Sequence, residues 1–174
     1  MNTAGLLAVA AGTAFIVYRG FSKKQAGKNV NTQPKTTDVV VVGASNMDLI
    51  TYCQRCPEPG ETIHGKTFEQ GFGGKGANQA LAATRAGAQV KMAGAVGQDD
   101  FAASSIELLK TAGTDLSFIK SVEGPTGTAL ILVGGDGENM IAVVPGANGK
   151  VVSEDAELLL KSMSAGDSIL LQME

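Results

Sequence analysis

Four consecutive valines constrain the fold of this chain more than any other feature. The run Val39–Val42 ends at Gly43 and contains no polar side chain. An uninterrupted β-branched run of this length predicts a strand buried on both faces, as strands are in parallel sheets. Two later stretches, Val90–Val96 and Ser168–Leu171, predict further buried strands of the same kind. Parallel strands need long crossover connections, usually helices, so helical segments should lie between these strands.

Three such helical segments are predicted. Ala77–Ala86 is alanine-rich and is followed by Gly87, a residue that commonly ends helices. Asp99 and Asp100 predict the cap of a second helix that runs to about Ala112 and ends at Gly113. Ser153 predicts the N-cap of a third helix.

Two pairs of short strands interrupt this alternation. Leu49–Cys53 and Thr62–Phe68 flank a proline- and glycine-containing turn, which predicts two edge strands joined by that turn. Thr128–Val133 and Met140–Val144 flank a turn of glycines and acidic residues, which predicts a hairpin. Strand–helix alternation with two short hairpins indicates an α/β sheet that carries a small β appendage.

The N-terminal residues differ from the rest of the chain. Residues 1–28 form an apolar segment with a basic flank, 29–37 a polar linker and 38–174 the folded domain. Residues 1–18 contain no charged side chain, and the basic cluster follows them, so neither a secretory signal nor a mitochondrial presequence fits. Two interpretations stay open: a short membrane anchor that leaves the main domain in the cytoplasm, or a targeting or dispensable extension.

Charge and side-chain chemistry exclude several classes of function. The net charge of −3, the absence of Trp and an aromatic content of 5% argue against nucleic-acid binding. Cys53 and Cys56 form a C-x-x-C pair, but His64 is the only histidine and there is no second cysteine pair to complete a zinc site. We therefore expect free thiols and no metal ligands among these residues.

The glycine-rich segment 71–76 resembles two phosphate-binding motifs without matching either. It contains G-x-G-x-x-G but follows a predicted exposed hairpin instead of a buried strand, which argues against dinucleotide binding. A P-loop would need Ser or Thr after Lys75, where the chain has Gly76, and glycine in place of Glu69. A glycine turn that begins a helix, with Lys75 and Asn78 beside it, suits a polyhydroxy or phosphorylated ligand. A purely structural turn is the alternative.

The segment from Gly73 to Gly97 resembles the first signature of PfkB-type carbohydrate kinases. It reads Gly-Gly-Lys-Gly-Ala-Asn-Gln-Ala from Gly73 to Ala80, with Gly87 and Gly97 at the spacing of the family. This wording is most similar to that of ribokinases. The likeness extends in order from about Val39 to the last residue, through the segments 43–48, 59–62, 126–129, 137–139, 146–148 and 172–174.

The resemblance implies a ribokinase-like three-layer sandwich, with a central, mostly parallel sheet and a small β-hairpin lid. It implies that Asn46 and Asp48 bind ribose hydroxyls, that the glycine turn supplies a second group of contacts, and that Glu174 supplies a third. The substrate-binding set implied in this way is Asn46, Met47, Asp48, Gly74, Lys75, Gly76, Ala77, Asn78 and Glu174, with Lys75 also near the transferred phosphoryl group. The hairpins would form a lid that covers the sugar and pairs with a second subunit.

The activity implied by the resemblance is ATP-dependent phosphorylation of D-ribose to D-ribose 5-phosphate, with Mg²⁺ and a K⁺ activator. In this family the catalytic base is an Asp in a downstream Gly-Ala-Gly-Asp segment. We expect that Asp, the nucleotide site and the cation site beyond residue 174, so the C-terminal half of the fold would be missing and this chain alone inactive. Two alternatives remain: a kinase of another sugar or of nucleosides, and a non-catalytic fragment that pairs with a full-length kinase.

Overall fold

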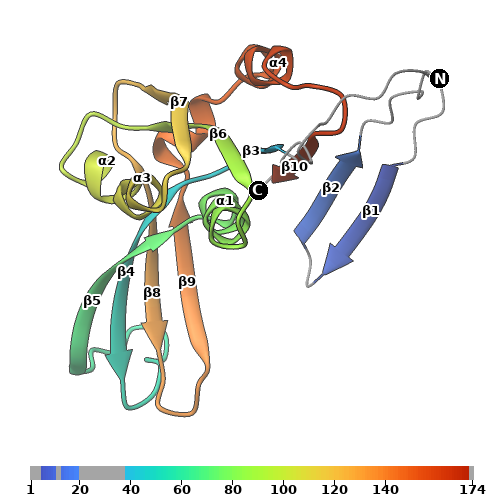
Figure 1. The fold of residues 1–174 in the computed structure, drawn as a ribbon. Helices are drawn as coiled ribbons and strands as arrows, with labels where there is room; N and C mark the ends of the chain where they lie inside the picture. Colours follow the sequence, from blue (N-terminus) through green and yellow to red (C-terminus); the bar gives the residue numbers. More distant parts are fainter. Residues whose placement is uncertain (1–4, 11–12, 20–37, 173–174) are drawn as a thin grey trace, which may run out of the picture.

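A computed structural model describes residues 5–10, 13–19 and 38–172 of the chain. Strands in the described part form two sheets that share no strand, and sheet B extends downward in Figure 1 from the part that contains the helices and sheet A. Sheet A has the strand order β1-β2-β10-β3-β6-β7, and sheet B has the order β5-β4-β8-β9. The strands are β1 Gly5–Ala10, β2 Thr13–Arg19, β3 Asp38–Val42, β4 Asn46–Cys53, β5 Gly65–Gly73, β6 Gln89–Val96, β7 Asp115–Ser121, β8 Gly127–Val133, β9 Asn139–Val144 and β10 Ser168–Gln172. The helices are α1 Lys75–Arg85, α2 Phe101–Ser104, α3 Glu107–Ala112, the 3₁₀ helix η1 Gly146–Lys150 and α4 Ser153–Lys161.

Sheet A has the parallel centre that the valine run predicts. β10, β3, β6 and β7 are parallel neighbours, and β2 pairs antiparallel with β10 at Ser168–Gln172. Successive side chains of a strand point to opposite faces, so β3 contributes to two cores. Val41 packs with residues of α1 and with Leu109 of α3, whereas Val40 packs with Leu159 of α4. Helices therefore cover both faces of the sheet, which confirms the three-layer α/β fold.

Sheet B joins the two predicted hairpins into one four-stranded sheet. β4 pairs antiparallel with β5, β8 pairs antiparallel with β9, and β4 and β8 join the two pairs in parallel. β4 is thus an interior strand, so the prediction that it would be an edge strand is wrong. The parallel join of β4 and β8 aligns Asp48 with Ala129, and the antiparallel pair of β8 and β9 aligns Ala129 with Val143. Residues in this register share one face of the sheet.

The single helix predicted over residues 99–112 is also wrong, because the segment forms the short helices α2 and α3. The hydroxyl of Ser105 donates to the carbonyl oxygen of Ala102 at 3.0 Å, a local side-chain bond that competes with continuous helix. Asp100 is the N-cap of α2 and makes no capping hydrogen bond through its side chain. The Asp99 carboxylate accepts from the backbone N–H of Thr126 at 2.9 Å and from the Thr126 hydroxyl at 2.6 Å.

Two smaller differences from the predicted elements concern the N-cap of the third helix and one additional strand. The third helix begins at Ser153, but its N-cap is Val152, whose N–H donates to the Asp155 carboxylate at 2.8 Å. β7 has no counterpart in the predicted elements. Its sequence, DLSFIKS, mixes polar and apolar residues, and its place in the sheet comes from pairing with β6.

Thr126 ties the start of β8 to the end of β6, and replacing it with valine should lower stability. The Thr126 side chain is fully buried, and its oxygen accepts from the N–H of Gly97 at 3.0 Å while donating to Asp99. Thr126→Val keeps the shape but leaves the Gly97 N–H without its partner, and the Asp99 carboxylate keeps only its bond from the Thr126 backbone N–H. We therefore expect a loss of about 1–3 kcal/mol in the free energy of unfolding by urea titration. Thr111→Val, at an exposed hydroxyl, is the matched control and should change it by less than about 0.5 kcal/mol. Equal losses in the two variants would contradict this role.

Because Asp99 titrates, the stability that its contact with Thr126 contributes should depend on pH. Burial raises its pKa, but the hydrogen bonds from Thr126 outweigh burial, so the pKa lies below its usual value. The stability that this shift contributes is present above the unfolded pKa, about 4, and is lost as pH falls through the folded pKa. The stability gap between the wild type and Thr126→Val should therefore narrow below about pH 4.

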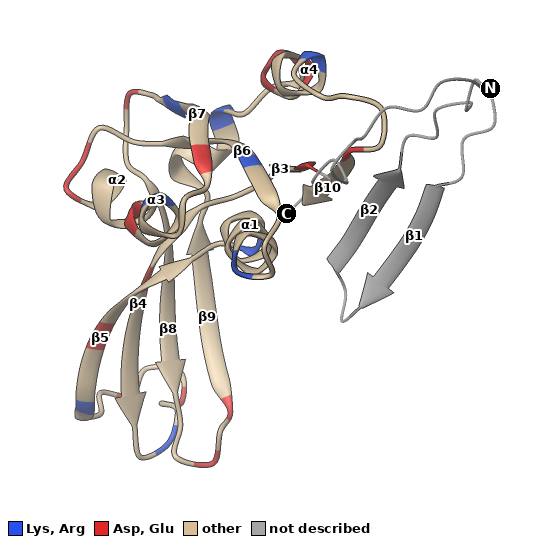
Figure 2. Cartoon of the chain, viewed as in Figure 1, with Lys and Arg blue, Asp and Glu red and all other residues tan. Residues whose placement is uncertain are grey.

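Charged side chains are spread over both sheets and the helices, and Lys and Arg gather on no single element of the described part (Figure 2). Within the described residues, no helix is both long enough and apolar enough to cross a membrane. The interpretation of residues 1–18 as an anchor stays a prediction.

Candidate functional site

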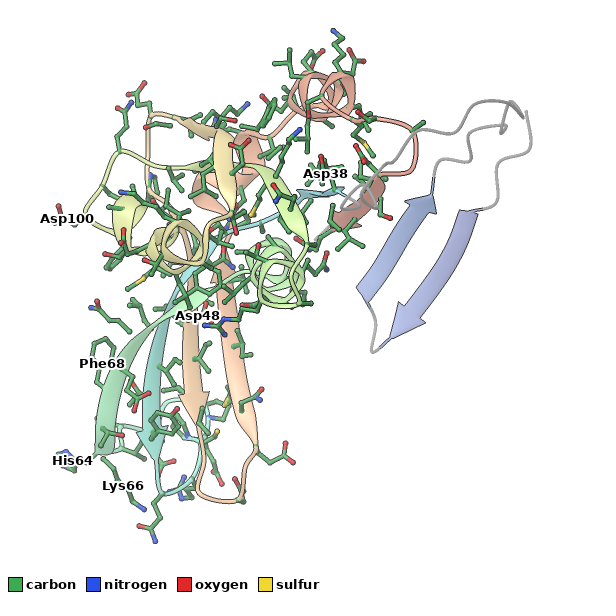
Figure 3. All side chains as sticks on the ribbon, in the orientation of Figure 1. Asp38, Asp48, His64, Lys66, Phe68 and Asp100 are labelled. Atoms are coloured by element: carbon green, nitrogen blue, oxygen red, sulfur yellow. The ribbon has the colours of Figure 1, made fainter. Side chains whose placement is uncertain are left out.

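A cavity of about 260 Å³ lies where sheet B meets the start of α1 and the turn between β3 and β4. Figure 3 shows Asp48 at this junction, whereas His64 lies at the opposite end of sheet B. The lining combines polar side chains at the α1 side with apolar side chains of β8 and β9. Its residues are Ala44, Asn46, Asp48, Gly74, Lys75, Asn78, Ala129, Ile131, Ile141, Val143, Pro145, Asn148 and Gln172.

Hydrogen bonds hold the turn between β3 and β4 in place from several sides. The N–H of Gly43 donates to the carbonyl oxygen of Ala93 at 3.2 Å, and the N–H of Ala77 in α1 donates to that of Ala44 at 3.0 Å. The N–H of Ala44 donates to Oε1 of Gln172, at the end of β10, at 3.0 Å. Because this turn leads directly into β4, these bonds fix the first residues of that strand.

Asn46 and Asp48 line the cavity from the start of β4. They lie two residues apart on a strand and therefore point to the same face of sheet B. Burial raises the pKa of the Asp48 carboxyl above its usual value, because a half-buried carboxylate has lost part of its hydration. The carboxylate lies across Gly73 of β5, where it leaves no room for a side chain. An amide and a carboxylate side by side can donate to and accept from neighbouring hydroxyl groups.

The glycine turn supplies the second polar side of the cavity. Gly74 is the N-cap of α1 and has a φ of 91°, a conformation that side chains other than glycine rarely adopt. Lys75 and Asn78 follow in the first turn of α1, and both are exposed and line the cavity. Asn78 and Lys75 therefore line the same cavity as Asp48.

Sheet B covers the cavity with apolar side chains. Ala129 and Ile131 of β8 pair with Val143 and Ile141 of β9 in register, and all four line the cavity. Ile141 and Val143 are 55% and 56% exposed, so this wall remains open to solvent on one side. A ligand with a polar rim and a carbon skeleton would bind between the two walls.

Five of the nine residues implied as sugar ligands line this cavity, namely Asn46, Asp48, Gly74, Lys75 and Asn78. Met47 is buried and points to the other face of β4, and Gly76 and Ala77 are buried where α1 packs against the turn after β3. Those three residues lie next to the cavity but do not line it. Glu174 lies outside the described residues.

Sequence reasoning gave no role to Asn148 and Gln172, which both reach the cavity. Asn148 lies in η1 and contacts Ser45 and Asn46, and Gln172 contacts Ala44. These contacts join residues more than 100 positions apart. The segments 146–148 and 172–174 contributed to the family resemblance, but no local pattern indicates that they meet at one turn.

Metal ligands do not gather in the part of the chain that the structure describes. No group of three or more His, Cys, Asp or Glu side chains there could hold a metal ion. Cys53 and Cys56 are free thiols.

Comparison with known proteins gives a consistent picture. The model of the pfkB family of carbohydrate kinases matches residues 36–172. Ribokinase from Mus musculus is 42% identical over 137 residues, which cover 78% of this chain and 42% of the relative. Deoxyribokinase from Salmonella typhimurium is 36% identical, over 79% of this chain and 45% of the relative.

Solved structures agree with the sequence relatives. The structure of Arabidopsis thaliana ribokinase complexed with ribose and ATP superimposes with a TM-score of 0.58 at 37% identity. The match covers 65% of this chain and 37% of that one. The chain thus spans less than half the length of the relatives it matches. With the family model covering most of the chain, and with the fold and cavity described above, the chain belongs to the pfkB family of carbohydrate kinases.

Proposed function

We propose that this chain forms the sugar-binding part of a ribokinase, which transfers the γ-phosphoryl group of ATP to the terminal hydroxyl of D-ribose and gives D-ribose 5-phosphate. The observation that supports this most is the cavity in which Asn46, Asp48, Lys75 and Asn78 face an apolar wall of sheet B. Its volume of about 260 Å³ lies just below the roughly 300–1,000 Å³ of drug-sized ligand sites, which suits a ligand as small as a monosaccharide.

Each lining group has a part in this proposal. Asp48 accepts hydrogen bonds from sugar hydroxyls, and Asn46 and Asn78 supply amides that can donate or accept. Lys75 places a positive charge beside the α1 start, where a phosphoryl group would carry negative charge. The apolar side chains of β8 and β9 contact the carbon skeleton and exclude water, which limits wasteful hydrolysis of ATP.

ATP, Mg²⁺ and K⁺ complete the proposed reaction. Mg²⁺ would neutralise the phosphate oxygens during transfer. The described residues bind and orient the sugar, and we assign the general base to the downstream Asp of the family. With D-ribose, Mg-ATP and K⁺, the 174-residue chain should therefore give no ribose 5-phosphate above the background without protein. Product from this chain would assign the base to Asp48 or to another of its carboxylates.

Sugar binding is the direct test of the proposed function. Isothermal titration of the chain with D-ribose, 2-deoxyribose, fructose and adenosine should rank D-ribose tightest, by about tenfold or more. A site whose polar groups bind the hydroxyls of a sugar discriminates against a ligand that lacks one of them. The polar group that would have bound the missing hydroxyl is then left unpaired in the complex. Tighter binding of adenosine would identify a nucleoside kinase, and tighter binding of fructose another sugar kinase. No binding of any of the four would contradict the proposal.

A second candidate substrate is 2-deoxyribose. It is favoured by the similarity to deoxyribokinase over the same 79% of the chain. Equal or tighter binding of 2-deoxyribose in the titration above would select this alternative.

We also propose that the protein forms a homodimer through sheet B. The face of this sheet opposite the cavity exposes large apolar side chains, with exposed fractions of 58% for Phe68, 51% for Leu130 and 52% for Met140. Stable monomers seldom leave a contiguous apolar patch of this kind in water. Light scattering after size-exclusion chromatography should report a dimer that Leu130→Asp converts to monomer. A monomeric wild type would contradict dimerisation, and co-elution with a full-length kinase would instead favour pairing with such a partner.

A further inference from the structure

Asn46 is an amide whose two ends have opposite hydrogen-bonding character, and the orientation of that amide decides what the cavity offers a sugar. If the oxygen faces the cavity, Asn46 accepts a hydrogen bond beside the acceptor Asp48. If the NH₂ group faces it, the two side chains form a donor and acceptor pair. The contacts of Asn148 decide between these arrangements.

The backbone of Ser45 fixes the orientation of the Asn148 amide. The N–H of Ser45 donates to Oδ1 of Asn148 at 3.0 Å, and Nδ2 of Asn148 donates to the carbonyl oxygen of Ser45 at 3.0 Å. A peptide N–H can only donate and a peptide C=O can only accept, so the opposite amide orientation would lose both bonds. Ser45 itself is fully buried, and its hydroxyl donates to the carbonyl oxygen of Ser105 at 3.0 Å.

Asn148 in turn fixes Asn46. Nδ2 of Asn148 also approaches Oδ1 of Asn46 at 2.8 Å. Because Nδ2 carries two hydrogens, it can donate to the Ser45 carbonyl and to Asn46 at the same time, provided that Asn46 presents its oxygen. The NH₂ group of Asn46 is then the end left for the cavity, which Asn46 lines together with Asp48.

The chain packs closely around these two amides. Gly127, the first residue of β8, pairs with Asn46 in the parallel join of β4 and β8. A Cβ atom there would overlap both Nδ2 of Asn148 and Oδ1 of Asn46. The absence of a side chain at this position lets η1, β4 and β8 meet at the amide pair.

We propose that Asn148 is a positioning residue that turns the Asn46 amide so that its NH₂ group donates to a sugar hydroxyl while Asp48 accepts from the neighbouring one. This inference deepens the proposed function and relies on it for the identity of the ligand. The donor and acceptor pair suits vicinal hydroxyls, since one hydroxyl accepts through its oxygen and the other donates its proton. Asn148 acts through Asn46 and needs no contact with the sugar.

Water-exchange NMR of the ¹⁵N-labelled chain tests the orientation without any sugar. In the wild type, the side-chain NH₂ protons of Asn46 should exchange at least about tenfold faster than those of Asn148, which are held between two acceptors. In Asn148→Asp the new carboxylate offers only acceptors, so the Asn46 amide should turn and its NH₂ exchange should slow about tenfold. Asn139→Asp, an exposed asparagine in β9, introduces the same charge and should leave the Asn46 exchange unchanged.

Binding measurements connect the orientation to the ligand. Asn148→Asp should weaken D-ribose binding about tenfold and reduce the preference for D-ribose over 2-deoxyribose, whereas Asn139→Asp should bind as the wild type does. A purely structural role would lower affinity for both sugars equally. Asn46→Asp provides a second arm, because it keeps an acceptor for Asn148 and replaces the donor facing the cavity. It should fold as the wild type does and bind D-ribose at least about tenfold more weakly.

The outcomes separate this inference from the proposed function. Slow Asn46 exchange in the wild type, or undiminished D-ribose binding by Asn46→Asp, would overturn the assigned orientation. Fast exchange in the wild type that slows in Asn148→Asp supports it, even if D-ribose fails to bind, and that failure would count against the proposed function alone. If Asn148→Asp does not fold, the wild-type exchange rates and Asn46→Asp decide the question.

Discussion

Asp48→Asn should weaken D-ribose binding by about 10- to 100-fold while leaving the chain folded. The substitution keeps the size of the side chain but removes the charge and one acceptor oxygen from the cavity. Hydrogen bonds to charged groups contribute about 1.5–3 kcal/mol, and each 1.4 kcal/mol is a factor of ten in affinity. Isothermal titration with D-ribose measures the change. Asp100→Asn, at an exposed carboxylate away from the cavity, is the matched control and should bind D-ribose as the wild type does (Figure 3).

Asp48→Asn should weaken D-ribose binding without lowering the stability of the folded chain. Burial raises the pKa of Asp48 in the folded chain, so the folded state holds its proton more tightly than the unfolded state does. The wild type therefore loses stability as pH rises from the unfolded pKa, about 4, through the folded pKa. Asp48→Asn removes this dependence and should be at least as stable as the wild type at pH 7, with the difference vanishing below about pH 4. A variant that unfolds more easily at pH 7 would mean that Asp48 serves the fold and not a ligand.

The sequence predicts the parts of this fold that depend on local pattern. The valine run of β3 is buried between two helical layers because every one of its side chains is apolar, and no other arrangement hides both faces. The sequence does not predict correctly those elements whose form depends on contacts with distant segments of the chain. β7 is held by pairing with β6. The segment 99–112 forms two short helices, with a bond from the Ser105 hydroxyl to Ala102 where they meet, and the Asp99 carboxylate bonds with the distant Thr126.

The residues of the candidate site also fall into a group that the sequence identifies and a group that it does not. Asn46, Asp48 and the glycine turn lie within about 30 residues of one another and carry the family signature, so sequence alone identifies them. Asn148 and Gln172 reach the same turn from 103 and 128 positions away, and their amides carry no local signal. Their positions follow from the parallel join of β4 with β8 and of β10 with β3, which no single segment encodes.

Gly74→Ala should be the most destabilising of the substitutions considered, with a loss of about 2–6 kcal/mol in the free energy of unfolding. The φ of 91° at Gly74 costs other residues about 1–3 kcal/mol. A Cβ atom there would also lie 2.5 Å from the carbonyl oxygen of Ala44, 2.7 Å from Cα of Ser45 and 2.8 Å from the N of Asn46. All three are backbone atoms of the turn that fixes Asn46, so neither side can yield without moving the residues that line the cavity. Forced overpacking of this kind adds about 1–3 kcal/mol.

Gly87→Ala separates the two contributions, because Gly87 has the same φ of 91° and no atom within 4 Å of the Cβ position. Urea titration should show that Gly87→Ala costs about 1–3 kcal/mol, which is the backbone contribution alone. Only Gly74→Ala should lose D-ribose binding among molecules that remain folded, since only its methyl group displaces the turn before β4. Equal losses of stability in the two variants, with binding intact in both, would show that α1 can move away from the turn without disturbing Asn46. The cavity would then owe its geometry to Asn148 and Gln172 more than to the glycine turn.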